Sequence, residues 1–331
     1  MKVIRFVTTI AVVLAFFVVM LGAFTRLTDA GLGCPDWPGC YGRLVLPSGS
    51  QALAQAQQEY PYTPIESRKA WTEMAHRYAA GTLVLLVMII VIEAFRQRTI
   101  PRLIPIVLIL LIGFQAALGM WTVTLKLLPI VVMGHLLGGM LIFASLCYFR
   151  WQVSNVKQAN LSGWRFWIHL GLIIVFCQIA LGGWVSANYA GVACIGFPQC
   201  NGQWLPKLDF STGFQLFSSV GANYQGGLLD NDSRITIHMI HRLGAVVTLV
   251  YLLSLTSLIT WRIAIPSIRN VGLIVMMLVC LQFGLGIANV IYLLPLKVAV
   301  AHNGVAALLF ASLLSLRYLV AKGGQYARQR P

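Results

Sequence analysis

The sequence predicts an all-α integral membrane protein in which eight transmembrane helices form two tandem four-helix bundles as parallel repeats. Of its 331 residues, 58% are hydrophobic and only 10% are charged, whereas roughly a quarter of the residues in a soluble domain are charged. Eight apolar stretches each approach the length of about 20 residues that a membrane-spanning helix needs. The second half of the chain also repeats motifs of the first half at a nearly constant spacing.

The first predicted helix, 5–27, is apolar from Phe6 to Phe24. This run is too long for a signal-peptide core and lacks a convincing cleavage site, so we expect it to stay in the mature protein. The next three helices are predicted at 70–95, 101–124 and 129–149, and the last four at 164–187, 235–261, 267–291 and 297–319. The two long outer loops hold polar residues and aromatics at 48–71 and 209–234, where we expect short amphipathic helices over the mouths of the bundles.

The net charge of +15 is distributed unevenly along the chain. If the N-terminus is cytoplasmic, the inner segments hold 14 of the 24 basic residues but one of the nine acidic residues. Such a bias is the positive-inside signature of membrane topology. The charge therefore predicts cytoplasmic N- and C-termini and does not indicate a nucleic-acid partner. Because no transit peptide is recognisable, we expect the inner membrane of a bacterial cell.

The internal repeat defines two predicted domains, 1–155 and 156–331, each a four-helix bundle. With four spans in each unit, both copies enter the membrane in the same direction, so a pseudo-two-fold axis along the membrane normal should relate them. The matching features are the loops GLGCPDWPGCYG (31–42) and GVACIGFPQCNG (191–202), 160 residues apart; His76-Arg77 and His241-Arg242, 165 apart; and His135 and His302, 167 apart.

Four histidines lie near the outer ends of their predicted helices, two in each bundle. Ionisable residues inside a membrane are costly and usually functional. Two imidazoles at one depth on different helices can bind one iron from opposite sides, which favours haem over zinc, since zinc needs a tetrahedral set of ligands. The predicted axial ligands of haem iron are His76 and His135 in the first bundle, and His241 and His302 in the second.

One position differs between the two copies in a way that suggests chemistry. Glu73 and His238 each stand three residues before a predicted ligand and thus share its helix face. A carboxylate near one iron site can act as a base or stabilise positive charge. The structural alternative is that Glu73 only pairs with Arg77 at a spacing of i,i+4.

Seven cysteines fall into two groups. Those within helices, at positions 147, 177 and 280, are simply small apolar residues. The other four lie in the outer loops, where an oxidising environment makes them disulfide candidates. Four cysteines allow three pairings, and the sequence alone leaves these open. They are Cys34, Cys40, Cys194 and Cys200.

Several motifs together resemble the haem A synthases, the membrane enzymes of bacteria and mitochondria that oxidise haem O. They are RLTDAGLGCPDWPGCYG (26–42), EMAHR, GHLLGG, IHR and AHNGVA, and the resemblance extends over nearly the whole chain. It implies oxidation of a ring methyl group of haem O to a formyl group, giving haem A for terminal oxidases. It also implies that each pair of loop cysteines, Cys34–Cys40 and Cys194–Cys200, forms a disulfide within its own loop.

The resemblance further assigns roles to the predicted site residues. The first bundle would bind the substrate haem O through His76 and His135, with Glu73 as the catalytic residue. The second bundle would hold a haem B cofactor through His241 and His302. The arginines that could contact haem propionates, Arg77, Arg242 and Arg26, have snorkelling at the interface as their alternative.

The expected partners are haem O, delivered by a haem O synthase, the lipid bilayer, the machinery that assembles terminal oxidases, and an electron acceptor that the sequence does not identify. Homo-oligomerisation is left open. The main alternative function is a di-haem membrane cytochrome that only transfers electrons, but it leaves the difference between Glu73 and His238 unexplained. A transporter fits less well, because no helix break near the midplane suggests a substrate site.

Overall fold

The computed structural model describes residues 1–97, 100–154 and 156–321, and the chain within these ranges is mostly helical. Eight helices are long and apolar enough to cross a membrane. Their bounds agree with the predicted ones to within a few residues. They are α1 (Lys2–Leu27), α3 (Ser67–Arg96), α4 (Leu103–Thr124), α5 (Pro129–Val153), α6 (Ser162–Ala187), α8 (Asn231–Arg262), α9 (Pro266–Ile291) and α10 (Leu296–Leu319).

The remaining elements are short. Helix α2 (Ser50–Glu59) lies in the first long loop and α7 (Phe210–Gly213) in the second, where the sequence predicts short helices. Strands β1 (Ala159–Asn160) and β2 (Val320–Ala321) form one parallel pair. The predicted cytoplasmic C-terminus, within residues 322–331, and the predicted domain boundary at residue 155 lie outside the described residues.

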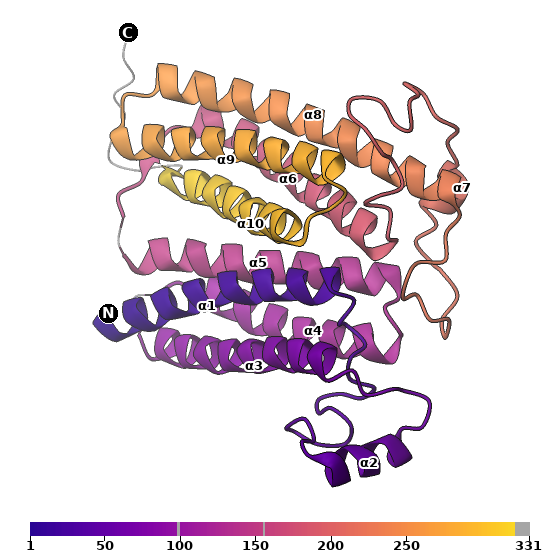
Figure 1. Ribbon diagram of the computed structural model, residues 1–331. Helices are drawn as coiled ribbons and strands as arrows, with labels where there is room; N and C mark the ends of the chain where they lie inside the picture. The colour runs from indigo at the N-terminus through magenta and orange to yellow at the C-terminus, as the bar shows by residue number, and fades with distance from the viewer. Residues whose placement is uncertain (98–99, 155, 322–331) are drawn as a thin grey trace.

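The long helices fall into two groups by their contacts (Figure 1). In the N-terminal group, α1 packs on α3, α3 on α4, α4 on α5, and α5 back on α1. In the C-terminal group, α6, α8, α9 and α10 contact one another in the same cyclic order. Helices α1 and α5 meet α10, and α5 also meets α6, so these four helices form the interface between the groups.

Small residues allow the two groups to pack closely, as is usual between membrane helices. A methyl carbon added to Gly183 of α6 would lie 3.0 Å from a side-chain carbon of Leu136 on α5. Gly304 of α10 abuts the side chains of Met20 and Phe16 on α1 in the same way. The interface therefore depends on backbone-to-side-chain contact at positions where only hydrogen fits.

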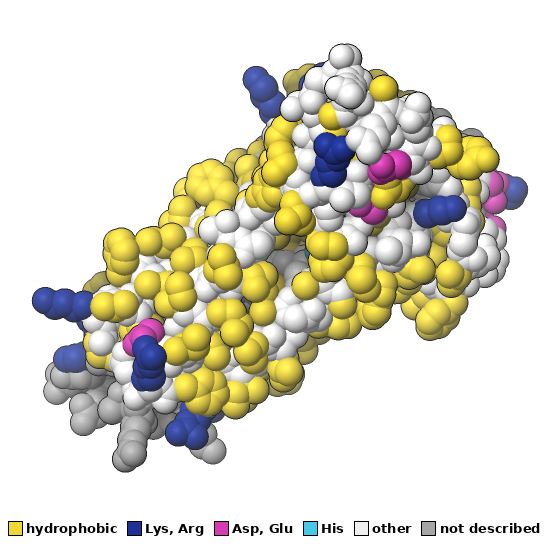
Figure 2. Space-filling view, turned by 90° about the horizontal axis from the view of Figure 1, so that it is seen from below, with side chains coloured by type: hydrophobic (Ala, Val, Ile, Leu, Met, Phe, Trp, Pro, Cys, Tyr) yellow, Lys and Arg dark blue, Asp and Glu magenta, His cyan; other side chains and the backbone are white. Residues whose placement is uncertain are grey.

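The two ends of the molecule differ. The N-terminus lies at one end, and the long loops with α2 and α7 lie at the other (Figure 1). Figure 2 shows Lys and Arg side chains gathered near both ends, while hydrophobic side chains cover the middle of this face. An apolar belt between charged ends is what a membrane-spanning bundle needs in order to match the bilayer.

The buried core occupies the half of the bundle nearer the termini. All eight long helices contribute to it, at 4–15 on α1, 83–94 on α3, 108–112 on α4, 140–153 on α5, 168–179 on α6, 252–259 on α8, 268–279 on α9 and 307–319 on α10. The four histidines predicted as iron ligands lie in the other half, near the loop ends of their helices. Dense packing at one end thus holds the helices together and leaves the loop end free to enclose a cavity.

Candidate active site: two pairs of histidines in one cavity

A cavity of about 1180 Å³ opens in the loop half of the molecule. This volume exceeds the roughly 300–1,000 Å³ of an ordinary small-molecule pocket. All four histidines predicted as iron ligands contribute to its wall, and so do Glu73 and His238. The sequence predicts two separate sites, whereas the structure places the six side chains around one continuous space.

In the N-terminal group, His76 on α3 and His135 on α5 line the cavity, and their rings lie in a T-shaped arrangement. Their centroids are 6.3 Å apart and their planes are inclined by 79°. The Nδ1 atoms of both rings are buried and have no hydrogen-bond partner among the described residues. A metal ion bound by imidazole lies about 2 Å from each nitrogen, so this separation leaves room for one ion between the rings.

In the C-terminal group, His241 on α8 and His302 on α10 line the same cavity. The two rings are close enough for a charge on one to act on the other. Here glutamine amides contact the rings. The Nε2 atom of Gln178 on α6 lies 3.1 Å from His241 Nδ1 and donates to the His241 carbonyl oxygen at 3.0 Å. The Nε2 atom of Gln282 on α9 lies 3.1 Å from His302 Nε2.

The N-terminal group has one comparable amide contact. Gln115 on α4 donates to the carbonyl oxygen of His135 at 2.7 Å, which is the kind of interhelical hydrogen bond expected in a membrane bundle. Its side chain lies against Gly138, one turn beyond the histidine, just as Gln178 lies against Gly244. No glutamine occupies the position of α1 that corresponds to Gln178, because Val18 stands there.

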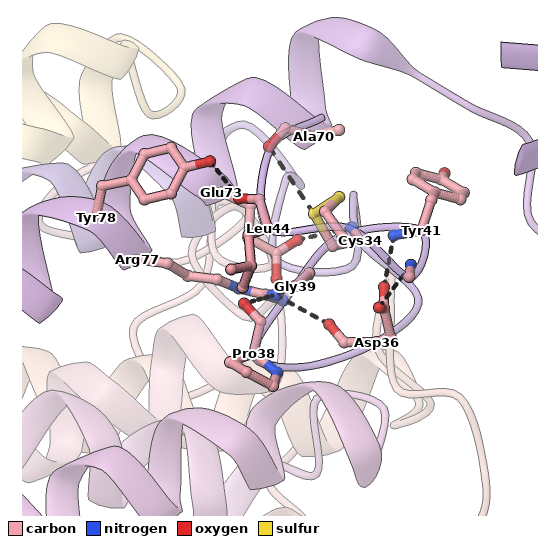
Figure 3. Close-up of a disulfide and its surroundings, with 12 residues drawn as sticks. Cys34, Asp36, Pro38, Gly39, Tyr41, Leu44, Ala70, Glu73, Arg77 and Tyr78 are labelled. Atoms are coloured by element: carbon pink, nitrogen blue, oxygen red, sulfur yellow. Dashed lines mark hydrogen bonds and ion pairs between the residues drawn. A yellow bond between two sulfur atoms is a disulfide. The ribbon is translucent and has the colours of Figure 1, made fainter. Parts of the chain in front are cut away.

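Glu73 is buried, with 4% of its surface exposed, and its carboxylate has two fixed partners (Figure 3). One oxygen accepts a hydrogen bond from the backbone N–H of Cys34 at 2.9 Å. The other forms an ion pair with Arg77 at 2.5 Å. Both partners stabilise the ionised carboxylate. The structure therefore shows the i,i+4 pair, and it also places the carboxylate on the cavity wall.

Arg77 connects α3 to the loop that holds Cys34. Its guanidinium donates to the carbonyl oxygens of Asp36 at 2.9 Å and Pro38 at 3.2 Å, and it also contacts Gly39. Because guanidinium offers five donors, one side chain can serve the loop and Glu73 together. The loop contacts all come from Nη1 and the contact with Glu73 comes from Nη2, and the predicted contact of Arg77 with a haem propionate stays a prediction.

His238 occupies the place of Glu73 in the C-terminal group and has a different partner. Its Nδ1 atom lies 2.9 Å from the carbonyl oxygen of Ala190, to which it donates when protonated there. Arg242 donates to the carbonyl oxygens of Gln199 at 3.2 Å and Cys194 at 2.6 Å. Both arginines thus hold their cysteine loops, but only the N-terminal one is also paired with a carboxylate.

Each cysteine loop contains a disulfide, Cys34–Cys40 in the first and Cys194–Cys200 in the second. The first loop buries Tyr41, and α2 packs on it through Ala56, so α2 lies beside this loop rather than across the cavity. Burial, reinforced by the carboxylates of Glu66, Glu73 and Asp36, raises the pKa of the Tyr41 phenol. Tyr41 is therefore neutral at physiological pH and donates to the carbonyl oxygen of Pro64.

Arg26 lies where the two helix groups meet. It donates to the carbonyl oxygen of Ser186 on α6 at 2.5 Å, its guanidinium stacks 3.9 Å above the ring of Tyr189, and it pairs with Asp29 at 3.5 Å. Tyr189 in turn donates to Asp29. This side chain ties the loop ends of α1 and α6 together, and its predicted contact with a propionate stays a prediction.

These residues suit a haem better than a bare metal ion. Among the described residues, no group of three or more His, Cys, Asp or Glu side chains could hold a metal ion. Paired histidines in an apolar cavity are the usual axial ligands of haem. The orphaned Nδ1 atoms at His76, His135 and His302 identify ring nitrogens that the described protein residues leave without a partner.

Sequence reasoning missed the residues that surround the ligands from neighbouring helices. Gln178 is one, and a glycine that faces each histidine ring is another. Gln178 has no match in the first half, so the repeat gives no signal for it. The repeat does match Gly119 with Gly286, at the same spacing as the histidines they face, and this match was the available clue.

Known proteins resemble this chain over nearly its full length. A family model described as "Cytochrome oxidase assembly protein" (COX15-CtaA) matches residues 5–314. The chain is 43% identical over 319 residues to a protein of Shewanella oneidensis named "Heme A synthase", and the match covers 94% of both chains. Proteins of the same name from Chelativorans sp. and Caulobacter sp. are 30% and 28% identical; these matches cover 89% and 95% of this chain, and 84% and 94% of theirs.

Proposed function

This chain belongs to the COX15-CtaA family of cytochrome oxidase assembly proteins, and we propose that it is a haem A synthase. Such an enzyme is an oxidoreductase that converts a ring methyl group of haem O to a formyl group. One observation carries this proposal at the level of the site: the buried carboxylate of Glu73 lies on the wall of the cavity that His76 and His135 face. Ligands for an iron porphyrin and a group able to handle charge thus occur together.

We propose that the N-terminal group binds the substrate and the C-terminal group holds a resident haem B. Gln178 supports this division, because it contacts both the ring and the backbone of His241. Partners that orient a ligating histidine typically strengthen binding 10–100-fold. The matching position beside His76 is Val18, which has no side-chain donor and reaches the ring only through its backbone. A histidine without a side-chain partner of this kind suits a substrate that must leave as product.

Glu73 is the proposed catalytic residue. Oxidation of the methyl group leaves positive charge on the reacting carbon, and a carboxylate next to it lowers the energy of that charge. Glu73 can also take a proton from water that adds to this carbon. Two rounds of two-electron oxidation, with oxygen from water, give a hydrated aldehyde that loses water to form the formyl group. Cys34 and Arg77 hold the carboxylate in place during these steps.

The chain's other residues shape the site for a lipophilic substrate. Haem O carries a prenyl tail, so access from the bilayer avoids exposing this tail to water. His241 and His302 would hold haem B, which supplies one-electron redox chemistry when bound. The four electrons and four protons released in the two oxidations would have to leave for an external electron acceptor. Arg77, Arg242 and Arg26 line the cavity and are the proposed contacts of haem propionates.

We propose that the chain arose by tandem duplication, giving two parallel four-helix bundles at 1–155 and 156–331. The recurrence of local backbone features supports this. Asp29 and Tyr189 both have positive φ, and so do Tyr41 and Asn201, each pair at the spacing of 160 residues. We also propose a bacterial inner membrane, and the charge bias favours cytoplasmic termini and cavities towards the periplasm. Haem O synthase and oxidase assembly factors are the proposed partners.

Conversion of haem O tests this function. The full-length chain is expressed in membranes that contain haem O but no haem A, and extracted pigments are analysed. We expect haem A with the natural chain and none above background with Glu73→Gln. Glu93→Gln is the matched control, since Glu93 lies on the same helix in an ion pair with Arg96 but far from the histidines. Haem spectra without any conversion by the natural chain would instead identify an electron-transferring cytochrome.

A further inference from the structure

Each of the four histidines predicted as iron ligands has one edge of its ring next to a glycine of the neighbouring helix. A methyl carbon placed on these glycines would lie very close to the Cε1 atom of the ring in every case. The distances are 3.0 Å for Gly22 and His76, 3.2 Å for Gly119 and His135, 3.0 Å for Gly182 and His241, and 3.3 Å for Gly286 and His302.

The contact has the same form at all four places. For Gly22, the methyl carbon would be 3.6 Å from both ring nitrogens of His76, and for Gly182 it would be 3.7 Å from both ring nitrogens of His241. The glycine thus faces the carbon between the nitrogens and leaves both nitrogens to other partners. Gly22 and Gly182 are 160 residues apart, and Gly119 and Gly286 are 167 apart, which are the spacings of the internal repeat.

Close helix packing alone does not account for this pattern. Gly113 on α4, Gly163 on α6 and Gly284 on α9 lie on the same helices, yet an added methyl carbon would meet nothing within 4 Å. On three of the four helices, therefore, one glycine is free and another faces a histidine. Non-bonded carbon atoms prefer a separation of about 3.5–4.0 Å, so a side chain at the facing positions would have to displace the ring.

We propose that Gly22, Gly119, Gly182 and Gly286 are positioning residues that set the orientation of the four iron-ligating imidazoles. This inference rests on the proposed haem-binding function. A ligand ring must be held to within about 0.5 Å for productive coordination, and an added methyl group would shift it by several tenths of an ångström. A glutamine lies 3.1 Å from a ring nitrogen of both His241 and His302, so both rings have little freedom to move away, and His241 also has the shorter glycine distance.

The test uses pairs of glycines on one helix. Full-length chains carrying Gly182→Ala or Gly286→Ala are purified with their bound haem and compared with Gly163→Ala on α6 and Gly284→Ala on α9. Electron paramagnetic resonance of the oxidised haem, its midpoint potential and the haem content per chain are measured. We expect shifted resonance and potential and a several-fold loss of haem for Gly182→Ala, a smaller change for Gly286→Ala, and natural values for both controls.

Natural spectra and haem content in Gly182→Ala and Gly286→Ala would overturn the proposal, as would equal changes in the control variants. If Gly286→Ala does not accumulate in membranes, it is combined with His302→Ala, which removes the ring that the new methyl group would meet. Accumulation at the level of His302→Ala alone supports the contact, and continued loss argues for a general packing role. A natural chain that binds no haem would refute the proposed function itself, a separate outcome.

Discussion

The two helix groups line the cavity with corresponding histidines, but the side chains next to these histidines differ. In the N-terminal group, Glu73 stands three residues before His76, accepts a hydrogen bond from Cys34 and pairs with Arg77. In the C-terminal group, the corresponding side chain is His238, which contacts the carbonyl of Ala190. The first loop thus offers a backbone N–H to a carboxylate, and the second offers a backbone carbonyl to an imidazole. Each loop therefore suits the side chain that stands before the histidine in its own group.

A second difference concerns the histidines themselves. His241 is held on its ring and on its backbone by Gln178, whereas the corresponding neighbour of His76 is the apolar Val18. Features shared by both groups, such as the arginine-to-loop contacts and the glycines that face the rings, serve any bound haem. Under the proposed function, the features that differ separate a site for chemistry from a site for retention.

Copying the C-terminal side chain into the N-terminal group should have the largest effect. Glu73→His removes the carboxylate, so we expect haem A formation to fall by about 100-fold or more, the range typical of general acid–base groups. The reciprocal change, His238→Glu, should create no second conversion activity. Pigment analysis of membranes measures both. Normal haem A formation by Glu73→His would show that the difference between the groups is not catalytic.

Removing one ligand from each group should distinguish cofactor from substrate. His241→Ala should remove most of the low-spin haem from the purified chain, on the order of tenfold or more, because even indirect partners of metal ligands contribute that much. His76→Ala should retain this haem but lose haem A formation. Optical spectra and haem analysis provide the measurement. Loss of resident haem from His76→Ala alone would reverse the proposed assignment of the two groups.

Exchanging the residue that stands beside the first histidine of each group, Gln178 or Val18, should give a smaller effect. Gln178→Val copies the N-terminal group and should weaken haem retention by about tenfold, since the ring of His241 loses its hydrogen-bond partner. Val18→Gln should slow release of product without loss of resident haem. Haem transfer to an excess of apomyoglobin reports retention. Equal retention in Gln178→Val and the natural chain would remove the structural argument for a resident cofactor.

The smallest expected effect concerns the short helices in the two long loops. Asp209 caps α7 by accepting from Ser211 and Thr212, and these hydrogen bonds lower its pKa to about 2, whereas α2 has no side-chain cap. A lowered folded-state pKa means that the stabilisation is present above the unfolded value of about 3.9 and lost as the pH falls through about 2. The protection of α7 amides, taken relative to their intrinsic exchange rate at the same pH, should therefore fall over this window and in Asp209→Ala. Exchange at α2 should not respond.

Much of this design is visible in the chain itself. Apolar stretches of membrane-spanning length locate all eight helices, since this signal is local and repeated. The internal repeat identifies His76, His135, His241 and His302 as a related set. The contrast between Glu73 and His238 also follows from alignment of the two halves. The structure then places all six side chains around a single cavity.

Other features could not be read from the sequence. Hydrophobic periodicity does not say which helices are neighbours, so it could not pair Gln178 with His241 or a glycine with each ring. The sequence also did not indicate that Arg77 and Arg242 donate to backbone carbonyls of the loops; their contact with propionates stays a prediction. Almost every residue has the same backbone carbonyl, so the sequence does not show which carbonyl an arginine will contact.

The amino-acid order by itself determined how many helices cross the membrane, where each begins and which side chains stand at the same depth, because these properties depend on residues adjacent in the chain. Only the tertiary structure decided that the ring centroids of His76 and His135 lie 6.3 Å apart. It also decided that the backbone of Cys34 donates to Glu73 and that a glycine lies next to each ligand ring. Those contacts join segments far apart in the chain, and the packing of whole helices sets their distances.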